Sequence, residues 1–180
     1  AASHSGVIGA IGGTQLPPVV SAFRAFEAGA RSVNPSVRVL TAYVGNWEDA
    51  SAAREQALAQ IARGADVIFQ DADAAGLGVF QAARQANGVR IIGSNSDQNA
   101  VAPEVTLGSV VIDLPRAMMM IARDVRNGTF KGHVYRLGDL DGVVRWTANP
   151  TLAKEIAPAT LIRLDSAKKV IDSGKLPIPE

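Results

Sequence analysis

The chain has 180 residues, of which 47% are hydrophobic, and a formal net charge of +1, so it can form one sizeable hydrophobic core. No block of Lys or Arg indicates a nucleic-acid-binding face, and no apolar run reaches the roughly 18 to 20 residues of a membrane-spanning helix. The absence of cysteine excludes disulfides, thiolate metal sites and thiol nucleophiles.

The N-terminal part of the chain alternates between short β-branched runs and longer amphipathic segments. Pro17 and Pro18 predict the first turn of a helix, where an amide hydrogen would have no partner in any case. Asp49 is expected to cap a second helix, and Gly64 to end it. In chain order we expect a strand over Gly6–Gly13, a helix over Pro17–Val33, a strand over Val37–Val44, a helix over Asp49–Arg63 and a strand over Ala65–Gln70.

The same alternation continues towards the C-terminus. In chain order we expect a helix over Gly76–Ala86, strands over Val89–Gly93 and Val105–Ile112, a Met-rich helix over Leu114–Arg126, a sixth strand over His133–Leu137 and a closing helix over Ser166–Asp172. Repeated strand–helix–strand units predict an α/β fold, a parallel sheet with helices on both faces. Ligands of such sheets bind outside the carboxyl ends of the strands, so the loops there are the candidate site.

Carboxylates occupy two of these loops. Asp71 and Asp73 follow one expected strand, and Asp97 follows the next. They could do acid–base chemistry or hold Mg²⁺, and they could equally accept hydrogen bonds from a polar ligand or cap turns. Neither His4 nor His133 stands in a catalytic-triad or metal-site pattern, and no phosphate-binding glycine loop is present. We therefore expect a binding site without catalytic residues, metal or cofactor; a small metal-assisted enzyme using the three aspartates is an alternative.

Two aromatic side chains stand beside the same loops. Trp47 follows one strand, and Phe69 lies near the end of another. A flat ring at the mouth of a cleft can stack on a planar ligand, contributing on the order of 1 kcal/mol beyond burial. Phe69 could equally pack in the core, because it lies on the strand itself.

A series of blocks along the chain resembles the second lobe of one protein family. They are, in order, Ile8–Gly13, Phe23–Gly29, Tyr43–Asp49, Gly64–Gln70, Gly76–Phe80, Ser96–Gln98, Asp124–Val125, Gly128–Gly132 and Gly138–Val143. Together they resemble the basic membrane protein family, the purine-nucleoside-receptor type of substrate-binding lipoprotein. The resemblance covers nearly the whole chain.

This resemblance implies a periplasmic-binding-protein type I fold, in which two α/β lobes close on a ligand by hinge motion. Residues 6–113 would form the second lobe, and residues 114–132 a helix that normally packs on an N-terminal lobe absent from this sequence. Residues 133–180 would form a return strand, a C-terminal helix and a tail. The uncovered helix would be an apolar patch, so we expect self-association, with a homodimer as its simplest form.

The resemblance also implies roles for single residues. Phe69 matches an aromatic that stacks on the base, and residues 72–76 match a glycine-rich turn that approaches the ligand with its backbone, although Asp73 and Ala74 stand where glycines are common. Asn95 replaces an aspartate that accepts sugar-hydroxyl hydrogen bonds, and Ile112 stands where nucleoside receptors often have lysine. Because an amide offers one acceptor and two donors, we predict a free base or similar planar heterocycle rather than a standard nucleoside.

The resulting prediction is an extracytoplasmic solute-binding component of an ABC importer, located in the periplasm or at the cell surface. Its partners would be a small planar ligand and a transporter permease, with no nucleic acid. Membrane contact would come only through a lipid anchor on the absent N-terminus. The alternative is the ligand-sensing effector domain of a regulator, which shares the fold. The predicted ligand-binding residues are Trp47, Phe69, Asp71, Asp73, Gly76, Asn95 and Asp97.

Overall fold

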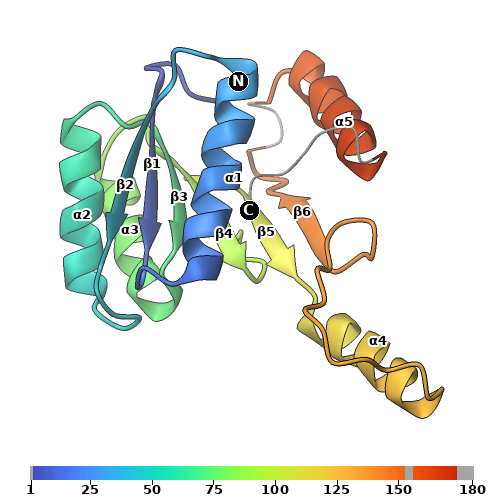
Figure 1. Cartoon of the computed structure of the whole chain (residues 1–180). Helices are drawn as coiled ribbons and strands as arrows, with labels where there is room; N and C mark the ends of the chain where they lie inside the picture. The colour runs from blue at the N-terminus through green and yellow to red at the C-terminus, as the bar shows by residue number, and fades with distance from the viewer. Residues whose placement is uncertain (1, 153–155, 174–180) are drawn as a thin grey trace.

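The computed structural model describes residues 2–152 and 156–173 (Figure 1). In chain order the elements are β1 (Val7–Gly12), α1 (Pro17–Val33), β2 (Arg38–Tyr43), α2 (Ala50–Ala62), β3 (Val67–Asp71), the short 3₁₀ helix η1 (Asp73–Gly76), α3 (Leu77–Gln85), β4 (Arg90–Asn95), β5 (Thr106–Ile112), α4 (Leu114–Arg126), β6 (Val144–Ala148) and α5 (Pro158–Asp172).

The six strands form one sheet in the order β2-β1-β3-β4-β5-β6. Strands β1 to β5 are parallel, and β6 pairs with β5 in the antiparallel direction. The expected α/β fold is therefore confirmed, with one antiparallel strand added at an edge. We call the side where β1 to β5 end the carboxyl edge; it comprises residues 12–16, 44–49, 71–76 and 95–98.

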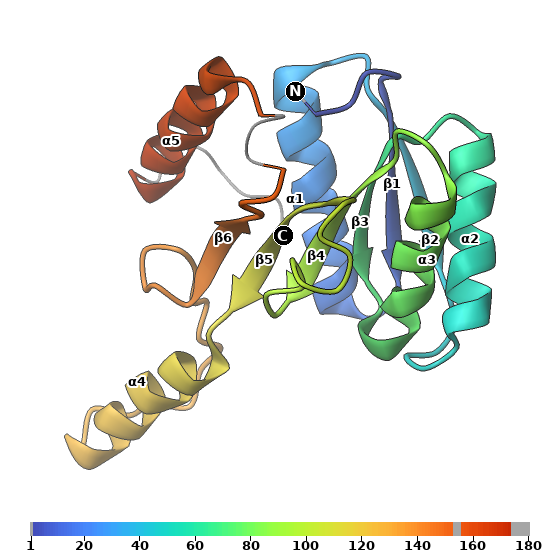
Figure 2. The ribbon, with the colours of Figure 1, turned by 180° about the vertical axis from the view of Figure 1, so that it is seen from behind.

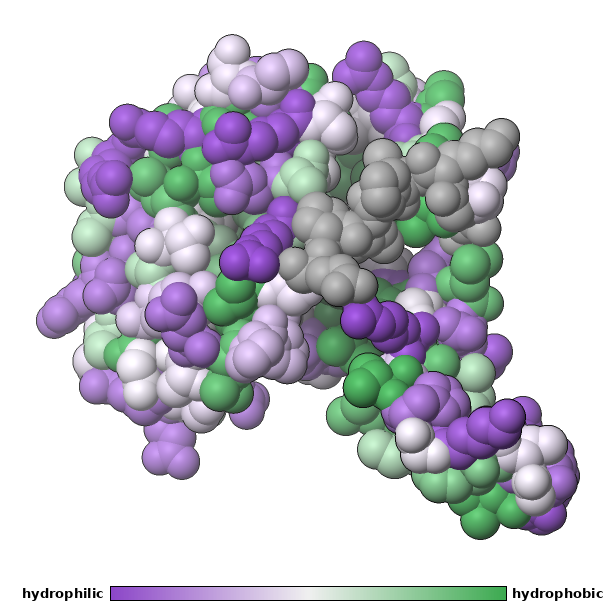
Figure 3. Space-filling view, viewed as in Figure 1, coloured by the Kyte–Doolittle hydropathy of each residue, from purple (hydrophilic) through white to green (hydrophobic). Residues whose placement is uncertain are grey.

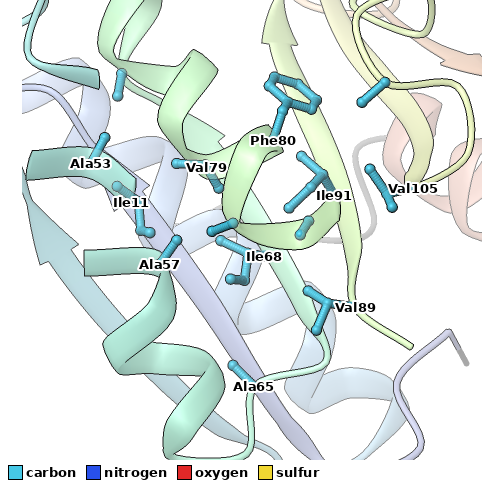
Figure 4. Close-up of a cluster of buried hydrophobic side chains, with 14 of the residues drawn as sticks. Ile11, Ala53, Ala57, Ala65, Ile68, Val79, Phe80, Val89, Ile91 and Val105 are labelled. Carbon is cyan, nitrogen blue, oxygen red and sulfur yellow. The ribbon is translucent and has the colours of Figure 1, made fainter. Parts of the chain in front are cut away.

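Helices cover both faces of the sheet. Helix α1 lies on one face, and α2 and α3 lie together on the other (Figures 1 and 2). Between the sheet and α2 and α3, the buried cluster includes Ile11, Ile68, Phe80 and Ile91 (Figure 4). Phe80 is 1% exposed, so its ring is fully covered by this core.

The start and end signals predicted for α2 are confirmed. The Asp49 carboxylate accepts a hydrogen bond from the Ala52 amide at 2.9 Å, as an N-cap does. Gly64 has φ of +95°, a left-handed conformation that glycine adopts at little cost after a helix.

The structure corrects the expected sixth strand. Residues 133–137 form no strand; instead they run along α4, where the Tyr135 hydroxyl donates to Asp124 at 3.2 Å and the His133 ring stacks on that of Tyr135. The sixth strand is β6, and Trp146 on it lies so close to Gly108 of β5 that a Cβ there would be 2.3 Å from the ring.

Helix α4 projects away from the sheet at the carboxyl edge (Figures 1 and 2). We call residues 114–142 the α4 arm. It leaves the end of β5 and returns to the start of β6, and at its base the Asp113 amide donates to the Val143 carbonyl at 2.7 Å. No helix in the described ranges is long and apolar enough to cross a membrane.

Candidate functional site

Backbone hydrogen bonds join the loops of the carboxyl edge. The Gly13 amide donates to the Asp71 carbonyl at 3.0 Å, and the Gly45 amide donates to the Gly13 carbonyl at 2.7 Å. The Ala75 amide donates to the Trp47 carbonyl at 2.8 Å. The loops that follow β1, β2 and β3 are therefore held as one surface.

Trp47 lies at this edge, as expected. Its ring packs against the end of β1, because a Cβ on Gly13 would lie 2.2 Å from Trp47 Cε3. The side chain is partly buried against the cluster that contains Val19 and Phe23. Glycine at position 13 is thus required for the ring to lie here, and ligand stacking by Trp47 stays a prediction.

Asp71 and Asn95 are brought together from neighbouring strands. The Asn95 side-chain amide donates to Asp71 Oδ1 at 3.0 Å. Asp71 is partly buried and Asn95 is exposed, so the pair joins the loops after β3 and β4 and faces solvent on one side.

Asp73 and Asn95 have an unusual backbone. Among the described residues, they are the two non-glycine residues with positive φ, +53° and +64° respectively. The left-handed conformation costs a residue with a side chain on the order of 1 kcal/mol or more, and Asn tolerates it better than most. Glycine at position 73 would relieve this strain, and backbone strain of this kind gathers at functional sites.

We predict that Asp73→Gly raises the free energy of unfolding by about 1 kcal/mol, because glycine adopts positive φ without strain. The neighbouring change Ala74→Gly removes a side chain without relieving such strain, so it should lower stability by a few tenths to about 1 kcal/mol. Urea unfolding followed by circular dichroism compares the two variants. Equal destabilisation by both would contradict the strain at Asp73.

A glutamine pair beneath the edge was not predicted. Gln70 is fully buried at the end of β3, and its amide donates to the Gln98 side-chain oxygen. Gln70 Oε1 accepts from the Ala72 amide at 3.2 Å, and Gln98 Oε1 also accepts from the Ser94 amide at 3.1 Å. The pair holds the loops after β3 and β4 together. In the sequence, the one sign of this pair was the glutamine at the end of the expected strand over Ala65–Gln70, which is otherwise largely apolar.

Two predicted site residues serve the packing of the sheet. Phe69 is 6% exposed and points to α1, with its ring centroid 5.8 Å from that of Phe23 and 5.3 Å from that of Phe26. Gly76 is buried, and a Cβ there would lie 2.0 Å from Gln70 Oε1. Their contacts with a ligand stay predictions.

Asp97 follows Asn95 by two residues, and its hydrogen bond goes to another partner than the Asp71–Asn95 pair. Its Oδ1 accepts from the Asn99 amide at 3.0 Å, and it lines a hollow of about 590 Å³ with Asn99, Thr147 and Asn149. Another cavity, of about 440 Å³, is lined by residues such as Ile8 and Phe26 and by none of the predicted site residues. In the described part of the chain, no group of three His, Cys, Asp or Glu side chains could hold a metal ion.

Comparisons with known proteins agree on one family. The sequence profile described as Bmp, ABC transporter substrate-binding protein PnrA-like, matches residues 1–178. Basic membrane protein A of Borreliella afzelii is 31% identical over 154 residues, which cover 83% of this chain and 47% of that protein. A purine-binding protein of Brucella abortus is 32% identical over 169 residues, which cover 92% of this chain and 47% of that protein.

A solved structure extends the likeness to the fold. The solute-binding protein of an ABC transporter system from Conexibacter woesei matches with a TM-score of 0.76 at 25% identity, covering 98% of this chain and 58% of that one. The chain spans about half the length of the curated relatives described above. Members of this family bind substrates and are not enzymes. With nearly every residue inside the profile match, the chain belongs to the Bmp family of PnrA-like ABC transporter substrate-binding proteins.

Proposed function

We propose that this chain is the C-terminal ligand-binding lobe of an extracytoplasmic receptor that delivers a small planar ligand to an ABC importer. The observation that carries the proposal is the carboxyl edge, where Trp47 and the Asp71–Asn95 pair lie on loops joined by hydrogen bonds. An aromatic ring beside a few fixed polar groups is the usual composition of a small-molecule site. A purine base or similar heterocycle suits this combination, as the name of the Brucella relative also suggests.

The α4 arm supports the proposal that a second lobe completes the site. Leu114, Met118, Met119 and Val125 are each more than half exposed on α4, and Figure 3 displays apolar residues along this arm. Large apolar side chains gathered on one projecting helix are typical of a surface that another element covers. We propose an N-terminal lobe of the longer protein as that element; in its absence a second copy of the chain would cover the same side chains.

We propose the remaining features of the receptor by analogy with its family. A transporter permease would recognise the closed form, and a lipid anchor at the N-terminus of the longer protein would hold the receptor at the membrane. Its place would be the periplasm or the cell surface. These assignments concern the whole protein, of which this chain corresponds to about half.

Native mass spectrometry of the purified chain with purine bases and nucleosides tests the proposal. Because one lobe presents half of a cleft, we expect monomers to bind with dissociation constants in the millimolar range, well above the micromolar values typical of complete sites. A base adduct without its nucleoside counterpart is the expected outcome. Micromolar or tighter binding by a proven monomer would contradict the half-site, and tight nucleoside binding through Asn95 would contradict the preference for a base.

A further inference from the structure

We propose that Asp71 and Asn95 form a specificity-determining pair that selects a heterocycle with an amino group beside a ring N–H, as in guanine or isocytosine. The inference rests on the proposed function and narrows its ligand class. Its starting point is the hydrogen bond of 3.0 Å from Asn95 Nδ2 to Asp71 Oδ1.

This hydrogen bond fixes the direction of the Asn95 amide. Turning the amide over would place Asn95 Oδ1 against the Asp71 carboxylate, and two acceptors facing each other repel. Asn95 Oδ1 is therefore held away from Asp71 as an acceptor, on a residue that is exposed. Asn95 thus offers a ligand a fixed acceptor, where a free amide could present either end.

The second oxygen of Asp71 adds another acceptor. Within residues 2–152 and 156–173, the Asp71 carboxylate makes no ion pair, and its side-chain hydrogen bond is the one from Asn95. Ile112, which is 37% exposed at the end of β5, supplies no cation at this edge. A partly buried carboxylate without a counter-charge favours a ligand that donates hydrogen bonds to it.

Two neighbouring acceptors match a ligand edge with two neighbouring donors. An amino group beside a ring N–H presents such an edge, and it can donate to Asp71 Oδ2 and Asn95 Oδ1 together. Hypoxanthine has a ring N–H without the neighbouring amino group, so it leaves one acceptor unmatched. Because hydrogen bonds to a charged acceptor are stronger than neutral ones, the amino group should improve affinity about tenfold or more.

Two small soluble probes isolate this amino group. Isocytosine carries it beside a ring N–H, and 4(3H)-pyrimidinone lacks it. Each is titrated into the ¹⁵N-labelled chain while NMR follows the Asn95 side-chain amide and the Ala72 backbone amide. We expect isocytosine to bind about tenfold more tightly. Asp71→Asn should reduce the preference to less than about twofold, whereas Glu55→Gln, which removes a charge from the exposed face of α2, should leave it unchanged.

The outcomes separate the inference from the proposed function. Equal binding of both probes, or a preference that survives Asp71→Asn, would contradict ligand selection by Asp71 and Asn95 but not the proposed receptor function. Binding of purines in native mass spectrometry without binding of isocytosine would likewise contradict the selectivity but not the receptor function. Failure of every base, nucleoside and probe to bind at millimolar concentration overturns both.

A second variant tests the pair without any ligand. Asn95→Asp would place two carboxylates at hydrogen-bonding distance, which raises the pKa of the pair because like charges disfavour ionisation. An acidic group whose pKa is raised by folding lowers the free energy of unfolding at pH values above that pKa. This loss of stability disappears at low pH, where the group is protonated in both the folded and the unfolded protein. Asn95→Asp should therefore be less stable than the wild type at pH 7 and close to it near pH 4. A stability difference that is the same at both pH values overturns the pairing.

Discussion

Gly78→Ala is expected to lower the free energy of unfolding by about 3 kcal/mol or more, although alanine favours helices. A Cβ on Gly78 would lie 1.8 Å from the Ala50 carbonyl oxygen and 2.8 Å from the Arg54 amide nitrogen. Both atoms belong to the backbone of α2, so no side-chain rotation can relieve the clash. Helix α2 or α3 would have to shift, and the buried cluster on that face of the sheet would lose contacts.

Gly29→Ala is the matched control, since Gly29 lies in α1 and a Cβ there would have nothing within 4 Å. The same chemical change at that position should raise stability by up to about 1 kcal/mol through helix propensity alone. Urea unfolding followed by circular dichroism measures both variants. A Gly78→Ala protein as stable as the wild type would mean that α2 and α3 do not make this close contact.

Gln70→Leu is expected to cost about 2 to 3 kcal/mol, because it leaves the buried Ala72 amide without an acceptor and takes one of two donors from the Gln98 side-chain oxygen. The Gln98 side-chain oxygen loses the Gln70 amide, and the Ala72 amide loses its acceptor. The loops after β3 and β4 should also open more often, so the Ala72 and Ser94 amides should exchange hydrogen faster. Urea unfolding and native-state hydrogen exchange by NMR measure the two effects.

Gln81→Leu is the control, because Gln81 is exposed on α3 and its replacement should change stability by less than about 0.5 kcal/mol. The double variant Gln70→Leu with Gln98→Leu should lose less stability than the sum of the two single losses, since each single variant already removes the Gln70–Gln98 hydrogen bond. Strictly additive losses, or unchanged exchange in the single variant, would show that the two glutamines act independently.

The regular part of the fold could be predicted because its signals are local. Helix α4 has the predicted bounds, Leu114–Arg126, and Asp49 caps α2 as expected. The strand predicted over His133–Leu137 was wrong. Val134 and Tyr135 are residue types that favour strands, but Tyr135 packs against His133 and donates a hydrogen bond to Asp124. Strand β6 was missed because its pattern is weak; it is an edge strand, and the carbonyls and amides of β5 determine its place.

At the candidate site, topology could be predicted and contacts could not. Parallel strands bring the residues after β3 and β4 to one edge, so the nearness of Asp71 and Asn95 follows from the alternation of elements. The Gln70–Gln98 pair joins residues 28 positions apart, and neutral amides form no recognisable motif. The sequence could not show whether Phe69 contacts a ligand or packs in the core. The answer depends on the packing of α1 against the sheet, which places Phe69 beside Val19 and Phe23.

The α4 arm is attached to the sheet at two neighbouring points, and this limits how it can move. Its ends join β5 and β6, and the Asp113–Val143 hydrogen bond ties the two attachments together. Swinging the arm needs matched backbone rotations in both attachments, whereas twisting it about its own axis would have to break that hydrogen bond. We therefore expect the arm to swing more easily than it twists, so that an element packed on α4 would move relative to the carboxyl edge as the arm swings.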